Sequence, residues 1–245
     1  MLPERLKRRD TAEAAQQQMV LCGNCRFTVL TDRLLRIEFA PDAVFEDRGT
    51  QSVVNRQFPE TPYRLKRDSR SIQIETGKLT LYWEHEAALS ALSVTVHTMP
   101  GNPVWHWGDE VHTLKGTCRT LDGYPVESNG ELGEGVCSRN GYSVLEDGGS
   151  LIVNDEGWVE QRPDGVTDIY FFGYGHDYIG ATRALYALTG LPPLLPHYVF
   201  GNWWSRFYSY DEESYLSLMD RFRKEDIPFT VAVIDMDWHW AGSGF

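Results

Sequence analysis

Hydrophobic and polar positions alternate with a period of two from about residue 25 to residue 170, and turn residues interrupt the alternation repeatedly. The apolar positions of 27–29 and 35–39 flank the polar segment 31–33, a pattern typical of a β-hairpin. Glycine-containing turn signals then recur at 77–78, 100–103, 122–123, 129–130, 140–141, 147–149 and 164–165. Many short strands at regular spacing, with almost no helical period, predict an all-β sandwich or barrel.

The pattern changes near residue 176. Residues 177–188 show the spacing of a short amphipathic helix, which Thr189 and Gly190 end. The proline-rich segment 191–196 is predicted to be a stiff linker, because proline fixes φ and removes a backbone donor. We therefore predict a sandwich domain over residues 25–192, preceded by a helical or disordered tail over residues 1–24.

Residues 193–245 are predicted to begin a different domain. Two near-continuous apolar runs, 198–204 and 229–234, flank an amphipathic segment that Asp211 is expected to cap. A strand, a helix and a strand in this order predict a β-α-β unit of a parallel sheet. Polar residues follow both strands, where parallel α/β folds place their active sites. One such unit leaves a sheet edge unpaired, so the expectation is a barrel that the chain does not complete.

Several segments together resemble glycoside hydrolase family 31, the α-glucosidase and α-xylosidase family. The strongest stretch is Gly201-Asn202-Trp203-Trp204-Ser205-Arg206, followed by Ile227-Pro228 and by 233–239, which reads Val-Ile-Asp-Met-Asp-Trp-His. The segments 45–51, 116–122 and 172–178 are also similar to the family's N-terminal sandwich. The resemblance implies a galactose-mutarotase-like sandwich, followed by the first β-α-β of a (β/α)8 barrel.

The same resemblance implies a retaining α-glycosidase that acts on α-glucosides or related α-linked oligosaccharides. Family members use two aspartates on later barrel strands, one as nucleophile and one as general acid/base, and this chain has no segment that matches them. The resemblance therefore implies that none of the residues present is catalytic. The 245-residue chain alone is expected to be inactive. The mechanism needs carboxylates only, so no cofactor is expected.

The resemblance also implies substrate-binding residues. Asp235 matches the aspartate after the second barrel strand, which hydrogen-bonds sugar hydroxyls, and Phe207 corresponds to an aromatic that lines the same subsite. Asp237 and Trp238 flank Asp235 and are expected to shape the pocket, while Asp122 belongs to a loop that reaches over the barrel mouth. Solvated loop carboxylates and packing aromatics are the alternative interpretation, and a plain Asp-Gly turn is the alternative for Asp122.

Charge and cysteine content argue against several classes of binding partner and against a metal site. A formal net charge of −12 argues against nucleic acid and against anionic membrane surfaces, since both require basic protein surface. The N-terminal segment has no apolar run of signal-peptide length, so the expected location is the cytoplasm. Cys22 and Cys25 have redox or zinc spacing, yet no second cysteine pair and no thioredoxin-like setting accompany them. Free thiols and no metal site are expected.

Two other functions compete with the hydrolase. One is a non-catalytic β-sandwich module that binds carbohydrate or a partner protein, and the other is an unrelated barrel hydrolase with a leading sandwich. The run 201–239 argues against the binding module, because a binding sandwich has no use for a β-α-β unit.

Overall fold

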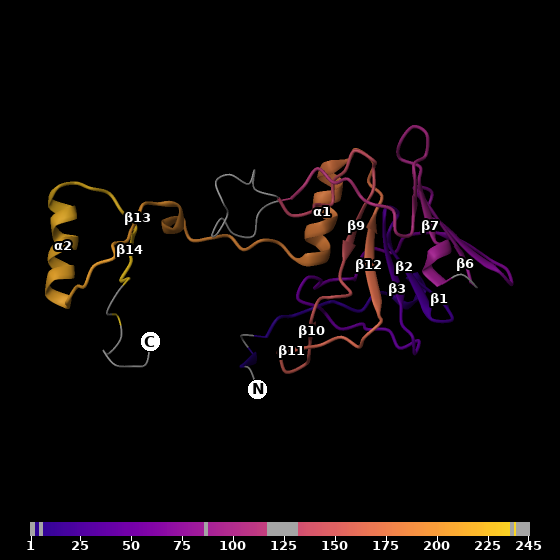
Figure 1. Ribbon diagram of the computed structural model, residues 1–245, viewed down its shortest axis with the longest axis horizontal. Helices are drawn as coiled ribbons and strands as arrows, with labels where there is room; N and C mark the ends of the chain where they lie inside the picture. The colour runs from indigo at the N-terminus through magenta and orange to yellow at the C-terminus, as the bar shows by residue number, and fades with distance from the viewer. Residues whose placement is uncertain (1–2, 5–6, 86–87, 117–131, 236–237, 239–245) are drawn as a thin grey trace. The chain divides into compact units, whose positions relative to one another are not determined.

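The computed structural model describes residues 3–4, 7–85, 88–116, 132–235 and 238 (Figure 1). Within it the chain forms two compact units, Met1–Leu191 and Pro192–Phe245. The boundary follows helix α1, in the proline-rich segment. Each unit is described by itself below.

The first unit contains two five-stranded antiparallel sheets, which we call sheet A and sheet B. Sheet A has the order β1 (Met19–Cys22), β2 (Cys25–Thr31), β3 (Leu34–Phe39), β12 (Thr167–Phe172), β9 (Ser143–Glu146). Sheet B has the order β4 (Arg64–Arg67), β5 (Ser71–Glu75), β6 (Leu79–Glu84), β7 (Ser93–Val96), β8 (Val104–His106). A small pair, β10 (Ile152–Val153) and β11 (Val159–Glu160), and short 3-10 helices at Gln16–Gln18 and Ala88–Ala91 complete the unit.

The alternating pattern places one apolar core between the two sheets. Phe27 and Ile37 of sheet A belong to the same buried cluster as Ile74 and Leu81 of sheet B. The hairpin predicted around residues 31–33 is confirmed, since β2 and β3 pair antiparallel. The hairpin around Gly77 is confirmed as well, because β5 and β6 pair in the same way.

A second cluster lies on the other face of sheet A. Helix α1 (Tyr178–Thr189) covers this face, and Figure 1 shows the helix and strands β6 and β7 on opposite sides of β12. Leu188 of the helix belongs to the same buried cluster as Leu34 and Tyr170. The predicted helix is confirmed: the Asp177 side chain accepts a hydrogen bond from the Gly180 backbone at its start.

The prediction of a tail over residues 1–24 is wrong for its second half. Met19–Cys22 forms strand β1 along β2, and Ala14, Gln18 and Val20 are buried. The backbone of Thr11 also bonds the segment near Asn55. The few apolar positions before residue 25 show no clear period, so the pattern did not predict a strand here. The segment nevertheless packs on the outer face of sheet A, where Ala14 joins the buried cluster.

Buried charges accompany the second cluster. Arg36, which is 1% exposed, donates to both carboxylate oxygens of Asp168 at 2.9 and 2.7 Å and contacts Glu38 at 3.0 Å. Arg162 also contacts Asp168, at 2.9 Å. We call the following eight residues the charge network: Arg26, Arg36, Arg56, Arg162, Glu38, Asp47, Asp147 and Asp168. Four positive charges balance four negative ones, so the sheet buries ions without a net charge.

Protonation of Asp168 is expected to destabilise the first unit by about 2 kcal/mol in acid. Burial alone raises the pKa of Asp168, but Arg36, Arg56 and Arg162 outweigh burial and hold this pKa at about 2. The unfolded-state pKa is about 3.9, so this contribution is complete above about pH 4 and is lost as the pH falls toward 2. Urea unfolding followed by circular dichroism at several pH values measures it. The same acid dependence in Asp168→Asn would contradict the assignment.

The second unit contains a parallel strand pair. Strands β13 (Trp203–Trp204) and β14 (Val231–Ala232) pair in parallel, and helix α2 (Glu212–Lys224) connects them. The predicted cap is confirmed, because the Asp211 side chain accepts from the Ser214 backbone at 2.8 Å. A 3-10 helix, His197–Phe200, precedes β13.

Both strands are shorter and more exposed than the sequence predicted. The first apolar run begins as the 3-10 helix, and none of the described residues from Pro192 onward is buried. Helix α2 packs on the strand pair through Phe222, whose ring lies 4.8 Å from that of Trp204 between centroids. The apolar runs therefore predicted the strands but not their length or burial.

Candidate functional site

Two of the residues that the sequence selected, Phe207 and Asp235, follow the carboxyl edge of β13 and β14. The Val233 backbone donates to the Trp204 carbonyl at 2.9 Å, so the parallel pairing persists to this edge. Phe207 lies three positions after the end of β13, and Asp235 lies three positions after the end of β14. Parallel strands bring their carboxyl ends to one edge, and both residues therefore follow the same edge.

These side chains are open to solvent. Phe207 is 80% exposed and Trp238 is 70% exposed. Asp235 is also exposed, and within the described part of the chain its carboxylate makes no hydrogen bond or ion pair. Asp237 and Asp122 lie outside the described residues. The edge thus presents an aromatic face and a carboxylate, which are groups that bind the apolar face and the hydroxyls of a sugar.

Contacts behind the edge fix the strand ends. The Tyr215 hydroxyl on α2 donates to the Val233 carbonyl at 2.8 Å, two residues before Asp235. The Thr230 hydroxyl donates to the Tyr198 carbonyl at 2.6 Å. Gly201 is required here, because a Cβ at this position would lie 2.2 Å from the Thr230 hydroxyl oxygen. The carbonyl and hydroxyl contacts orient the backbone that leads into the candidate site.

An aromatic group beside Phe207 was missed by the sequence analysis. The ring of Tyr210 lies 4.8 Å from that of Tyr208 and 5.2 Å from that of Tyr215, measured between centroids. The Arg206 guanidinium lies 4.3 Å from the centroid of the Tyr208 ring. Three aromatic residues within 207–210 were the available signal, and the sequence analysis selected only Phe207.

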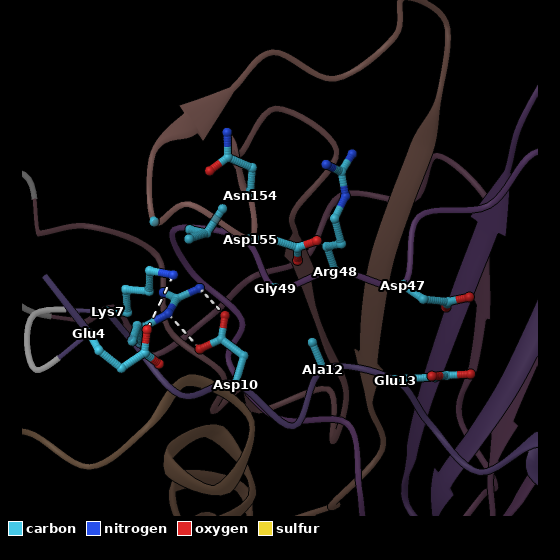
Figure 2. A pocket seen from close by; sticks show the side chains of 13 residues that line it. Glu4, Lys7, Asp10, Ala12, Glu13, Asp47, Arg48, Gly49, Asn154 and Asp155 are labelled. Atoms are coloured by element: carbon cyan, nitrogen blue, oxygen red, sulfur yellow. Dashed lines mark hydrogen bonds and ion pairs between the residues drawn. The ribbon is translucent and has the colours of Figure 1, made fainter. Parts of the chain in front are cut away.

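A cavity of about 360 Å³ in the first unit contains none of the predicted site residues (Figure 2). Its lining is charged, and its described cations are paired with carboxylates. Lys7 pairs with Glu4 at 3.2 Å, and Arg8 donates to Asp10 at 2.7 Å. Arg48 pairs with Glu46, outside the cavity lining.

The described residues contain neither a cluster of metal ligands nor a membrane-spanning helix. No group of three or more His, Cys, Asp and Glu side chains there is arranged to hold a metal ion. No helix in the same residues has the length and apolar character needed to cross a membrane.

Comparison with known proteins finds a family match over the second unit and similar folds among solved structures. Residues 192–245 match the profile of the glycosyl hydrolases family 31 TIM-barrel domain. A family 31 dextranase from Flavobacterium johnsoniae, solved with glucose, superposes with a TM-score of 0.55 at 14% identity. The resemblance to glycoside hydrolase family 31 is confirmed. A family 31 α-xylosidase from a soil metagenome, solved with xylose, superposes with a TM-score of 0.54 at 13% identity.

The family 31 structures are much longer than this chain. The superposition covers 89% of the chain and 32% of the dextranase, and 92% of the chain and 42% of the α-xylosidase. At these identities the likeness establishes the fold. No curated protein matches the sequence.

Proposed function

We propose that this chain is the N-terminal portion of a retaining α-glycoside hydrolase that acts on α-glucosides or related α-linked sugars. In this proposal the first unit is a galactose-mutarotase-like sandwich, and β13, α2 and β14 open a (β/α)8 barrel. The main support is the family 31 barrel match over 192–245, together with the parallel strand pair in the same residues. The exposed Asp235 and Phe207 at the carboxyl edge of that pair support a sugar-binding role.

The proposed roles follow from the chemistry of the side chains. An ionised Asp235 accepts two directed hydrogen bonds from neighbouring hydroxyls of one sugar ring. Phe207 offers an apolar platform to the C–H face of that ring. The resemblance to family 31 also assigns Asp237, Trp238 and Asp122 to the substrate site.

The catalytic pair must come from outside these residues. Retention requires two carboxyl groups about 5 Å apart, one ionised as nucleophile and one protonated as acid. The resemblance assigns both to later barrel strands, and the 245-residue chain alone is therefore expected not to hydrolyse glycosides. No organic cofactor takes part in this chemistry.

Reading the open reading frame through the codon for Phe245 is the direct test. The proposal expects further alternating strands and helices, with an aspartate at the end of a later strand. The complete product should then hydrolyse a nitrophenyl α-glucoside or α-xyloside with retained anomeric configuration. A stop codon directly after Phe245, or hydrolysis with inversion, would contradict the proposal.

A cavity at the edge of the sandwich favours a second function, a non-catalytic carbohydrate-binding module. This cavity of about 230 Å³ is lined by Trp105, Trp107, Asp109 and Glu146, among others. Trp105 is 3% exposed, and its indole N–H has no acceptor among the described residues. The half-buried ring of Trp107 lies in the same lining as the carboxylates of Asp109 and Glu146, a combination that suits a sugar ring.

Titration of the chain with maltose and isomaltose, followed by tryptophan fluorescence, tests the module. Saturation in the millimolar range that Trp107→Ala abolishes would support it. Trp158→Ala is the matched control, because Trp158 is 53% exposed and lies outside this cavity. Saturation that is unchanged in Trp107→Ala would exclude this cavity as the binding site.

A further inference from the structure

Two cysteines face each other across the hairpin of β1 and β2. The backbone register pairs Cys22 directly with Cys25, and the turn consists of Gly23 and Asn24. Gly23 has φ +55°, the left-handed conformation that two-residue hairpin turns require. Directly opposite residues of an antiparallel pair project from the same face of the sheet, so both thiols lie on one face. The buried cluster between the sheets contains Cys25 and contacts Cys22.

This register puts the two thiols within bonding reach. Opposed residues of antiparallel strands have Cα atoms about 4.5–5.5 Å apart, and disulfides span about 4.4–6.8 Å. Their Cβ atoms lie about 4.5–5.5 Å apart, at or beyond the upper end of the range that disulfides prefer. A disulfide here would therefore need only a small approach of the two strands and would be easily reduced. In the structure both cysteines are free thiols.

The two thiols differ in their surroundings. Cys25 is 1% exposed, and burial, together with the nearby Cys22, raises its pKa to about 12. Cys22 is half-buried, and its sulfur lies 3.4 Å from Nε2 of His85, directly after β6. The His85 ring also lies 5.2 Å from the Trp83 ring, between centroids. The imidazole can accept the Cys22 thiol proton, which favours Cys22 as the attacking group.

We propose that Cys22 and Cys25 form a reversible disulfide with small-molecule disulfides, of the glutathione-disulfide class, as the oxidant. The Cys22 thiol gives its proton to His85, and its sulfur attacks one sulfur of the reagent. The reagent S–S bond breaks, and one small thiol leaves with that proton. The Cys25 thiol then passes its proton to the departing sulfur while its own sulfur attacks the Cys22 sulfur, which releases the second small thiol. Two protein thiols are oxidised to one disulfide, and one small disulfide is reduced to two thiols.

Mass spectrometry of the full chain tests this site. Cys118→Ser and Cys137→Ser leave only the two cysteines of interest, and both lie in the tryptic peptide Asp10–Arg26. After incubation with glutathione disulfide and removal of the reagent, alkylation in urea should leave this peptide unlabelled and lighter by two hydrogen atoms. Dithiothreitol should restore two labelled thiols. Adding Cys25→Ser should stop the reaction at a stable mixed disulfide on Cys22.

His85 is the general base in this proposal, and its variant has a separate readout. His85→Ala should slow alkylation of Cys22 by roughly tenfold while circular dichroism stays unchanged. His112→Ala is the matched control, because His112 is exposed and contacts neither cysteine. Equal alkylation rates in the two variants would remove His85 from the mechanism.

Three results would overturn the disulfide itself. The first is a peptide that remains doubly alkylated after incubation with the oxidant. The second is a mixed disulfide that accumulates while Cys25 is present. The third is oxidation that proceeds no faster in the folded chain than in the urea-unfolded chain, because the proposal attributes the proximity to the hairpin register.

Discussion

Asp168→Asn is expected to lower the free energy of unfolding of the first unit by about 3–5 kcal/mol. The substitution keeps the shape of the side chain and removes one of the four negative charges of the charge network. Arg36 and Arg162, both at least nine-tenths buried, would then lose an ionised partner at 2.7 and 2.9 Å. Unpaired buried charge is costly because water cannot solvate it.

Urea unfolding followed by far-ultraviolet circular dichroism measures this loss. Glu225→Gln is the control, because it removes one partner of the exposed Arg221–Glu225 pair on α2. That control should leave the transition of the first unit unchanged, since exposed pairs contribute little. A change below about 1 kcal/mol in Asp168→Asn would mean that the network is dispensable for stability.

Asp235→Asn is expected to lower kcat/KM for an α-glucoside by roughly 100-fold in the enzyme that the complete open reading frame encodes. The amide keeps one acceptor oxygen but cannot hold two sugar hydroxyls as an ionised carboxylate does. Hydrolysis rates over a range of substrate concentrations give both constants. Asp220→Asn is the matched control, because Asp220 lies on α2 and pairs with Arg223.

Equal rates for Asp235→Asn and the unsubstituted enzyme would remove Asp235 from the substrate site. The proposed hydrolase would survive that outcome, because the catalytic pair is assigned elsewhere. Loss of activity in both aspartate variants would instead indicate a folding defect in the second unit. Circular dichroism of the two variants distinguishes these cases.

Sequence periodicity predicted the sandwich because its strands bury one face or both at regular positions. The hairpins around residues 31–33 and Gly77 follow from local turn chemistry and were predicted correctly. The antiparallel pairing of β3 with β12 joins residues that are far apart in the sequence, such as Arg36 and Tyr170, so no local pattern contained it.

The charge network was likewise hidden from sequence reasoning. Arg36 and Glu38 alternate with Leu35 and Ile37, which normally indicates a solvent-exposed face. Here the loop that carries Asp47 and the segment that carries Arg162 cover that face. At the candidate site, the family resemblance together with position after a strand selected Asp235 and Phe207. The contact of Tyr215 with the Val233 carbonyl, in contrast, depends on the packing of α2.

The position of β12 between β3 and β9 in sheet A limits how early the first unit can fold during synthesis. Strand β3 emerges from the ribosome with β2 already available, but its other neighbour begins only at Thr167. Until then Arg36 has no Asp168 to pair with, and one edge of β3 is open. The first unit must therefore complete folding late, after most of its residues are made. The shortest stable fragment would have to extend through β12 and α1, ending near Gly190.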